Sequence, residues 1–258
     1  MAKPDSRQAT ETLHELDSAL ERAAHWVATH PVAVLVILGS VLAGAAALGG
    51  YRAWDASREA DASAAVAAIQ ADYLRAMGAA PGALEVPEPA NAEAAAATRR
   101  EFAARFREAA EQHDGTAAAV TARLQAGTLL DELGQPEEAL AALRSALEAA
   151  PGGGTLEALA RTRLAARLET GGDAAGAAAE YLAAGRTEDF PGRVLALGNA
   201  ARAFADAGQQ ERALEVFGSL DEEEIRQLPP HVSARLAELR ARSQAAAPAP
   251  EPGPEAAR

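Results

Sequence analysis

Few side chains in this sequence of 258 residues have the types and spacing that catalysis or metal binding requires. Two histidines bind one metal ion from a single helix when they lie three or four residues apart, and no two of the five histidines have that spacing. The five are His14, His25, His30, His113 and His231. Cysteine is absent, which excludes disulfides, thiol catalysis and zinc sites with cysteine ligands. The sequence therefore predicts no metal site, and we expect structural or solvated histidines.

Two other clusters could bind charged ligands, but each has a simpler structural interpretation. The three glycines of residues 152–154 lack the lysine of a phosphate-binding loop, and they predict a turn between two helices. The acidic residues 221–224 could attract a basic partner, although acidic side chains are also favoured at the positive end of the helix dipole. No nucleophile elbow or zinc-protease motif occurs. We therefore expect no catalytic residue, no cofactor, no small-molecule substrate and no enzymatic activity.

The composition predicts helices and a protein partner. Aromatic residues make up only 4% of the chain, while the dominant Ala, Leu, Glu and Arg lose little side-chain freedom in a helix. The formal net charge of -13 would repel a phosphate backbone, and no local basic stripe offsets it. We therefore expect an all-α protein that binds other proteins and no nucleic acid.

An uncharged stretch near the N-terminus predicts a single transmembrane helix. No residue between Arg22 and Arg52 carries a full charge, and residues 32–50 are an unbroken run of 19 apolar or small residues. At about 1.5 Å per residue this run spans about 28 Å, close to the roughly 30 Å hydrocarbon core of a bilayer. Aromatic residues flank the run at positions expected near the membrane interfaces: Trp26, Tyr51 and Trp54. A membrane is therefore one expected partner.

Two alternatives for this stretch stay open, namely a cleaved signal peptide and a buried helix of a soluble protein. A signal peptide normally has a shorter apolar region and a basic leader, whereas residues 1–31 form a long, acidic and partly amphipathic leader. The positive-inside rule does not decide the orientation, because few basic residues lie near either end of the run. Small residues four apart, as at Ser40 and Gly44, would allow self-association through the span.

After the span, the sequence predicts a helical linker over residues 51–115. Its first helix continues beyond Trp54, and prolines and glycines in residues 78–89 predict a loop after it. A second helix is expected from about Ala92 to Gln112, with two phenylalanines one turn apart on its apolar face.

Residues 116–228 contain three units that repeat around a turn glycine. The turn glycines are Gly134, Gly172 and Gly208, and small or large apolar residues recur 5, 9 and 12 positions after each. This pattern resembles the tetratricopeptide repeat, in which small residues let paired helices approach and a large residue fills the groove to the next unit. The glycines are 38 and 36 residues apart, against about 34 in the standard repeat, and loops can absorb the excess. Generic alanine-rich antiparallel helices are the alternative.

The predicted fold is all-α: an N-terminal single transmembrane helix followed by a tetratricopeptide-like α-solenoid of about three helix pairs. Residues 229–244 are expected to form a capping helix, and residues 245–258 a disordered tail. In tetratricopeptide domains, ligands contact outward positions on the first helix of each pair. By that resemblance, the partner groove of this chain comprises Thr121, Leu124, Thr128, Asp131, Leu159, Thr162, Ala166, Glu169, Leu195, Gly198, Arg202 and Ala205.

The order of these parts is similar to that of the ancillary SecYEG translocon subunit family, over roughly residues 20–220. The more specific matches are Tyr51 and Trp54 after the span and the Arg-Leu-Ala triplet at residues 163–165. The resemblance implies a single-pass protein of the bacterial inner (cytoplasmic) membrane, with a cytoplasmic N-terminus and a periplasmic repeat domain. Its partners would be translocon subunits, periplasmic chaperones and exported chains, and a link to stress signalling is attributed to the family. The Pro-rich loop and the tail depart from the family pattern.

A scaffold for envelope assembly or cell division is the alternative function, because an anchored repeat domain suits either role.

Overall fold

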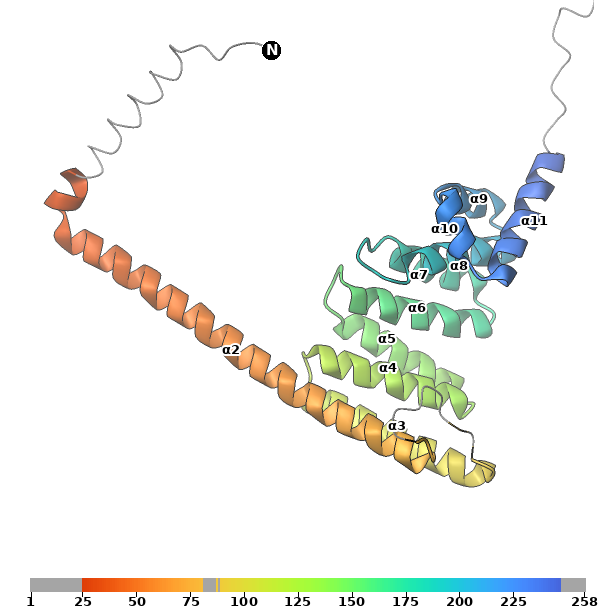
Figure 1. Cartoon of the computed structure of the whole chain (residues 1–258), viewed down its shortest axis with the longest axis horizontal. Helices are drawn as coiled ribbons and strands as arrows, with labels where there is room; N and C mark the ends of the chain where they lie inside the picture. Colours follow the sequence, from red (N-terminus) through yellow and green to blue (C-terminus); the bar gives the residue numbers. More distant parts are fainter. Residues whose placement is uncertain (1–24, 81–86, 88, 247–258) are drawn as a thin grey trace, which may run out of the picture. The chain divides into compact units, whose positions relative to one another are not determined.

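The computed structural model describes residues 25–80, 87 and 89–246. The predictions for residues 1–24, for most of the Pro-rich loop and for residues 247–258 lie outside the described residues. The chain divides into two compact units, Met1–Ser57 and Arg58–Arg258, and each is described by itself. In the described residues all regular structure is helical, without strands, so the predicted all-α class is confirmed (Figure 1).

The long helix α2 begins at Pro31 and continues to Ala76 without a break. Proline suits the first position of a helix, because the N–H group that it lacks would have no helical partner there. The apolar residues 32–50 lie in the first part of α2, where the most apolar window of 18 residues has a mean hydropathy of 2.4 and none of it is buried. By length and composition, α2 is the one helix in the described part of the chain that could cross a membrane.

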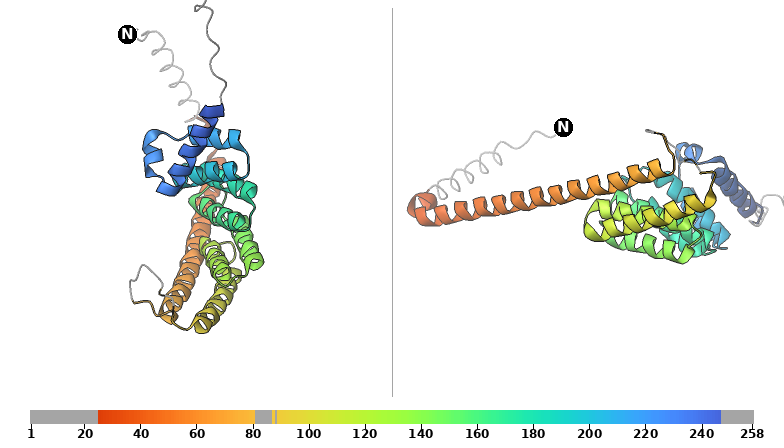
Figure 2. Two further views of the ribbon diagram at one scale, coloured as in Figure 1. Left: turned by 90° about the vertical axis from the view of Figure 1, so that its right-hand side faces the viewer. Right: turned by 90° about the horizontal axis from the view of Figure 1, so that it is seen from below.

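Nine further helices follow α2 in the described part of the second unit. They are α3 (Ala92–Gln112), α4 (Ala117–Glu132), α5 (Pro136–Ala149), α6 (Thr155–Thr170), α7 (Ala174–Gly185), α8 (Arg193–Asp206), α9 (Gln210–Gly218), α10 (Glu222–Gln227) and α11 (Pro230–Ala246). Helices α4 to α9 stack in chain order, and each packs mainly on its neighbours in sequence (Figures 1 and 2). This arrangement is that of a tetratricopeptide-like solenoid, as predicted.

The three turn glycines end the first helices of their pairs with the same backbone geometry. Gly134, Gly172 and Gly208 have φ of 69°, 87° and 76°, a region that favours glycine. In each turn the N–H of the residue after the glycine donates to the carbonyl five residues earlier, over 2.8 to 3.0 Å. This is the Schellman pattern, which pairs carbonyls that a helix end would leave without partners.

A fourth turn of the same kind occurs at Gly78, at the end of α2. Its φ is 82°, and Ala79 N–H donates to the carbonyl of Leu74 over 2.9 Å. Residues 58–76 of α2 and helix α3 therefore form a helix pair that precedes the three predicted ones. From Arg58 onward, the predicted linker is part of the packed unit.

The pair formed by α2 and α3 has its own apolar and polar contacts. The rings of Tyr73 and Phe102 meet edge to face with centroids 5.4 Å apart, and both side chains are buried. Arg105 of α3 pairs with Asp72 of α2 at 3.0 Å. Both helices share one hydrophobic cluster with α4, in which Phe106 is 1% exposed. The cluster buries the apolar face that α4 alone would leave in water.

Small residues set how closely successive helices approach. A Cβ atom at Gly127 of α4 would lie 2.9 Å from Cγ of Leu143 in α5, closer than real Cβ atoms come. A Cβ atom at Gly185 of α7 would lie 2.6 Å from Cγ of Leu197 in α8. These contacts confirm the prediction that small residues allow close packing and large residues fill the adjoining grooves.

Helices α10 and α11 cover the end of the stack, as the predicted cap requires. Val232 and Leu236 of α11 are fully buried in a cluster with residues of α7, α8 and α9. The predicted bounds of 229–244 compare with Pro230–Ala246 in the structure. The cap thus replaces the first helix of a further unit.

The two clusters considered for charged ligands have structural roles. Gly153, with φ of 77°, lies in the turn between α5 and α6. Asp221 accepts from the N–H of Glu224 at 2.8 Å, while the Glu224 carboxylate accepts from the N–H of Asp221 at 3.0 Å. This reciprocal capping box explains why acidic residues begin α10.

Candidate binding face on the first helices

The outward side of α4, α6 and α8, here called the first-helix face, is where the predicted groove residues lie. Thr121, Leu159 and Leu195 occupy the same position, 13 residues before the turn glycine of their unit, and all three are exposed. Leu159 is 36% exposed and Leu195 is 42% exposed. In the described part of the second unit, these are the two large apolar side chains with the greatest exposure. They therefore present exposed apolar surface at equivalent positions of two successive units.

Two of the predicted groove residues are not available on this face. Leu124 is 6% exposed and packs in a cluster with Val120 and Leu143, because α5 and α6 cover that side of α4. Gly198 is buried, and a Cβ atom there would lie 2.6 Å from Cδ2 of Leu228, which precedes α11. Both predictions are therefore wrong, because the covering segments come from other parts of the stack.

Four further predicted residues contribute small or satisfied side chains. Thr128 and Thr162 are half-buried, and their hydroxyls donate to the carbonyls four residues earlier at 3.1 and 2.8 Å. Ala166 is exposed, whereas Ala205 is half-buried against the C-terminal hydrophobic cluster. None of the four presents a strong hydrogen-bonding group to a ligand.

The remaining three predicted residues form ion pairs within the stack. Arg202 of α8 donates to both carboxylate oxygens of Glu169 in α6, one of the bonds being 2.8 Å long. These hydrogen bonds raise the pKa of Arg202 above its ordinary value. Arg167 of α6 lies 3.2 Å from Asp131 of α4, within ion-pair distance although its Nε–H forms no hydrogen bond.

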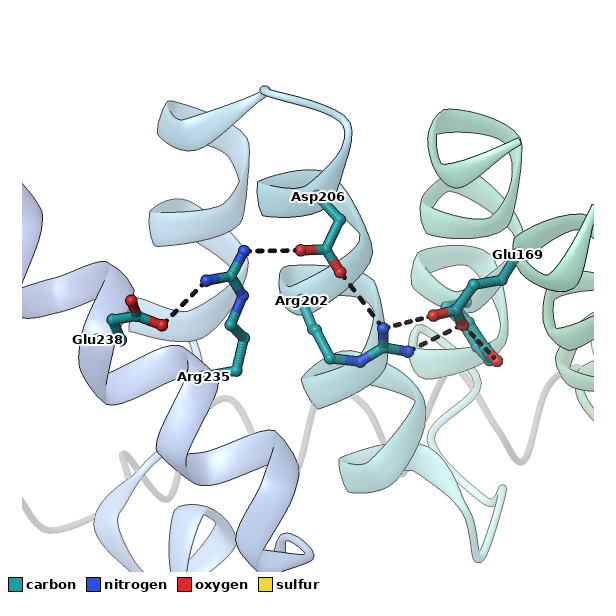
Figure 3. A network of polar contacts seen from close by, with 6 residues as sticks. Glu169, Arg202, Asp206, Arg235 and Glu238 are labelled. Atoms are coloured by element: carbon teal, nitrogen blue, oxygen red, sulfur yellow. Dashed lines mark hydrogen bonds and ion pairs between the residues drawn. The ribbon is translucent and has the colours of Figure 1, made fainter. Parts of the chain in front are cut away.

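The same pattern continues to the cap. Asp206 of α8 lies 3.4 Å from Arg202 and 2.9 Å from Arg235 of α11, which in turn pairs with Glu238 at 2.9 Å (Figure 3). Each first helix thus offers an acidic side chain near its C-terminal end to an arginine of the next such helix or of the cap. We call this series of pairs the ion-pair ladder.

Tyr181 of α7 lies beside the ladder. Its hydroxyl is 3.5 Å from a carboxylate oxygen of Glu169, and the side chain is only 4% exposed. Burial, with the negative charge of Glu169, raises the pKa of Tyr181 to about 12. The hydroxyl is therefore neutral throughout the physiological range.

A row of polar side chains on the face was missed by sequence reasoning. Gln125, Arg163 and Asn199 each lie nine residues before the turn glycine of their unit, and each is exposed or half-buried. Along each helix, they follow the position of Thr121, Leu159 and Leu195 and precede the acidic residue of the ion-pair ladder. Amide and guanidinium groups donate to peptide carbonyls, and counting back from the turn glycine could have identified them.

The aromatic residues predicted at the membrane interfaces are exposed in the first unit. Trp26, Tyr51 and Trp54 are 42%, 61% and 56% exposed. The rings of Tyr51 and Trp54 contact each other with centroids 6.1 Å apart, and Trp26 stacks on His30 at 5.2 Å. Large exposed rings on both sides of an apolar helix fit an interfacial position.

No metal-binding arrangement occurs in the residues that the structure describes, since no group of three His, Asp or Glu side chains lies close enough to hold an ion. The groups that the face presents are apolar side chains and hydrogen-bonding side chains such as those of Leu159, Leu195 and Gln125.

Comparisons with known proteins give one structural match. No family model matches the chain, and no curated protein matches it. A crystal structure of nearly identical TPR-like repeats, from a kinesin light chain candidate of Podospora anserina, matches with a TM-score of 0.45 at 15% sequence identity. The match covers 58% of this chain and 82% of that one. The tetratricopeptide-like description rests on the repeated turns and close helix contacts of this chain itself.

Proposed function

We propose that this chain is a membrane-anchored interaction module whose first-helix face binds segments of partner polypeptides. The observation that carries the proposal is the exposure of Leu159 and Leu195 at equivalent positions of successive units. An exposed leucine costs free energy in water, and a repeated pair on one face offers a partner about 25 cal/mol for each Å² of apolar surface buried. Amide and guanidinium side chains beside them would pair with the partner's backbone.

The anchor in this proposal is the first part of α2. Its apolar residues 32–50 are long enough to span a bilayer, and exposed aromatic rings flank them. None of the most apolar window is buried, which supports an anchor over a buried helix of a soluble protein.

The more specific role is that of an accessory translocon subunit. This role rests on the resemblance of the sequence to the ancillary SecYEG translocon subunit family. The role would put the repeat domain in the periplasm, where exported chains emerge unfolded. An unfolded chain exposes apolar and backbone groups together, which are the two kinds of group that the first-helix face would contact. Weak binding of such segments would allow their release to periplasmic chaperones.

Site-specific crosslinking in native membranes tests this function. A photoreactive amino acid at Leu159 or Leu195 should capture translocon subunits, periplasmic chaperones or exported chains, while the same group at exposed Arg144 of α5 should not. Capture of septal or peptidoglycan proteins instead would favour the scaffold role. Equal capture from Arg144 and from the face would reject the binding face.

A second measurement tests the anchor and its orientation. The chain should stay with the membrane after alkaline carbonate extraction, and added protease should reach the repeat domain in spheroplasts whose outer membrane is open. Release into the aqueous fraction would contradict the anchor. Protection of the repeat domain until the inner membrane is broken would contradict the periplasmic orientation.

A further inference from the structure

A cavity between two second helices of the stack, α7 and α9, is lined by three arginines. It extends across the first part of α8 and has a volume of about 390 Å³. Its charged lining residues are Arg186, Arg193, Arg212 and Glu215, and apolar residues such as Leu182 and Val216 complete the wall. None of the residues predicted for the partner groove lines it. The cavity is therefore a second candidate site with a different chemistry.

Contacts within the stack fix two of the three guanidinium groups. Arg212 lies over the ring of the buried Phe204, 4.1 Å from the ring centroid, and donates to the side-chain oxygen of Gln209 at 2.7 Å. Arg193 donates to the carboxylate of Glu224 at 2.5 Å. Groups that are already held in place lose less conformational freedom when they bind a ligand, so this part of the site is preformed.

The third arginine gives the cavity an excess of positive charge. Arg186 is exposed at the C-terminal end of α7, and its guanidinium group has no hydrogen-bond or ion-pair partner among the described residues. The carboxylates at the cavity are Glu215 in its lining and Glu224 beside Arg193. Three guanidinium groups against two carboxylates leave a local charge of +1, in a chain whose formal net charge is -13.

The corresponding cavity between the second helices α3 and α5 has balanced charges. Two arginines and two glutamates line it, namely Arg107, Arg123, Glu111 and Glu138. Arg212 and Glu138 both lie four residues after the turn glycine of their unit, so one repeat position carries opposite charges in the two cavities. Between α5 and α7, Arg161 pairs with two glutamates. The excess of cations between α7 and α9 is therefore specific to that part of the stack.

We propose that the cavity between α7 and α9 binds the carboxylate of an acidic side chain, Asp or Glu, of a partner polypeptide. Guanidinium groups present N–H donors that match the two oxygens of a carboxylate. One carboxylate neutralises the local charge of +1, whereas a phosphate group, with a charge of about -1.5 to -2 at pH 7, would exceed it next to Glu215. Leu182 and Val216 would contact the methylene groups of the acidic side chain.

The test uses the full chain in nanodiscs of zwitterionic phosphatidylcholine and three fluorescent probes. Each probe is an acetylated and amidated peptide with three repeats of Gly-Ser-Xaa-Ala, in which Xaa is glutamate, glutamine or phosphoserine. Fluorescence anisotropy at low salt should give the glutamate probe a Kd about tenfold or more below that of the glutamine probe, because hydrogen bonds to a charged group are stronger. The phosphoserine probe should bind no more tightly than the glutamate probe.

Three variants assign the binding to the cavity. Arg186→Gln removes one cation that has no contact to lose within the stack, and it should weaken binding of the glutamate probe about three- to tenfold. Arg144→Gln, at an exposed arginine of α5 that likewise has no partner among the described residues, is the matched control and should leave the Kd unchanged. Glu215→Gln removes a like charge from the lining and should tighten binding about threefold, a gain that loss of structure cannot produce.

The inference would be overturned by absent binding of the glutamate probe, by equal Kd values for the glutamate and glutamine probes, or by equal effects of Arg186→Gln and Arg144→Gln. Unchanged or weaker binding in Glu215→Gln would also contradict it. Tighter binding of the phosphoserine probe would reject a carboxylate site in favour of a phosphate site.

The inference goes beyond the proposed function, and the two can fail separately. Crosslinking from Leu159 and Leu195 judges the first-helix face, and neither leucine lines this cavity. Equal capture from Arg144 and from the face, together with arginine-dependent binding of the glutamate probe, would reject the face and retain the cavity.

Discussion

At the scale of the residue, the size of single side chains decides how the stack packs. Gly127 lies against Leu143, while Ala139 at the start of α5 has no exposed surface. Interiors of this density leave no space for additional atoms, so the same substitution has opposite effects at a packed and at an open glycine.

Gly127→Ala should destabilise the folded unit by about 1–3 kcal/mol, because the added Cβ atom would lie 2.9 Å from Cγ of Leu143 and must displace that side chain. Gly218→Ala is the control, since nothing lies within 4 Å of a Cβ atom there. It should be neutral or stabilise by up to about 1 kcal/mol, as expected when a glycine is replaced in a helix. Urea unfolding followed by circular dichroism measures both, and similar changes in the two variants would contradict the close contact.

Tyr181 links a single residue to the pH dependence of stability. Its hydroxyl loses a proton near pH 10 in an unfolded chain and near pH 12 in the folded one. Between these values the unfolded state has fewer bound protons than the folded state, so the free energy of unfolding decreases as pH rises.

Tyr181→Phe should therefore show a shallower loss of stability between pH 10 and 12 than the wild type. Below pH 10 the two chains should have parallel pH profiles. Denaturant midpoints measured at intervals of half a pH unit give the two slopes. Identical slopes above pH 10 would mean that Tyr181 titrates at its ordinary value.

At the scale of the element, the ion-pair ladder ties each first helix to the next and the last to the cap. The Arg202 and Glu169 side chains are 18% and 29% exposed, and two hydrogen bonds join them. The Arg226 and Glu223 side chains in α10 are 64% and 71% exposed. Water screens the second pair far more than the first, so only the first should affect stability appreciably.

Arg202→Ala should lower the free energy of unfolding by about 1–3 kcal/mol, because Glu169 keeps its partly buried charge without its cation. Arg226→Ala, the same substitution at an exposed pair, should change it by less than about 0.5 kcal/mol. Thermal unfolding of the two variants under one buffer condition compares them. A similar effect for both would show that the ladder contributes no more than a surface pair.

At the scale of the whole molecule, the described residues of the second unit form two large hydrophobic clusters. One cluster contains residues of α2, α3, α4 and α5. The other contains residues of α6, α7, α8, α9 and α11. A smaller cluster of α4, α5 and α6 residues, including Leu143 and Leu164, connects them. In a solenoid each helix pair contacts only its neighbours, so stability is distributed along the stack rather than concentrated in one core.

Replacing a buried side chain by alanine should therefore destabilise mainly the helices near the substitution. Phe106→Ala should cost about 3–5 kcal/mol and Leu236→Ala about 2–5 kcal/mol, as expected for fully buried side chains. Hydrogen exchange should accelerate mainly in α2 to α4 for the first variant and mainly in α8 to α11 for the second. Uniform acceleration across all helices in both variants would indicate a single cooperative unit instead.

Much of the fold could be predicted because its signals are local. The turns at Gly134, Gly172 and Gly208 and the bounds of α3 depend on nearby residues, and the structure has them as expected. The pair formed by α2 and α3 was missed because the long connection from Gly78 to α3 interrupts the repeat spacing. Its packing on α4 depends on contacts such as Tyr73 with Phe102, which lie 29 positions apart in the chain.

The sequence by itself determined an all-helical chain, a long apolar stretch and the places where the helices turn, since periodicity and glycine placement act within a few residues. Only the tertiary structure decided which outward positions stay open. Leu124 and Gly198 are covered by other helices, Glu169 and Arg202 pair with each other, and Leu159 remains exposed. The physical reason is that a pattern defines a face relative to its own helix axis, whereas exposure depends on what packs against that face from elsewhere in the chain.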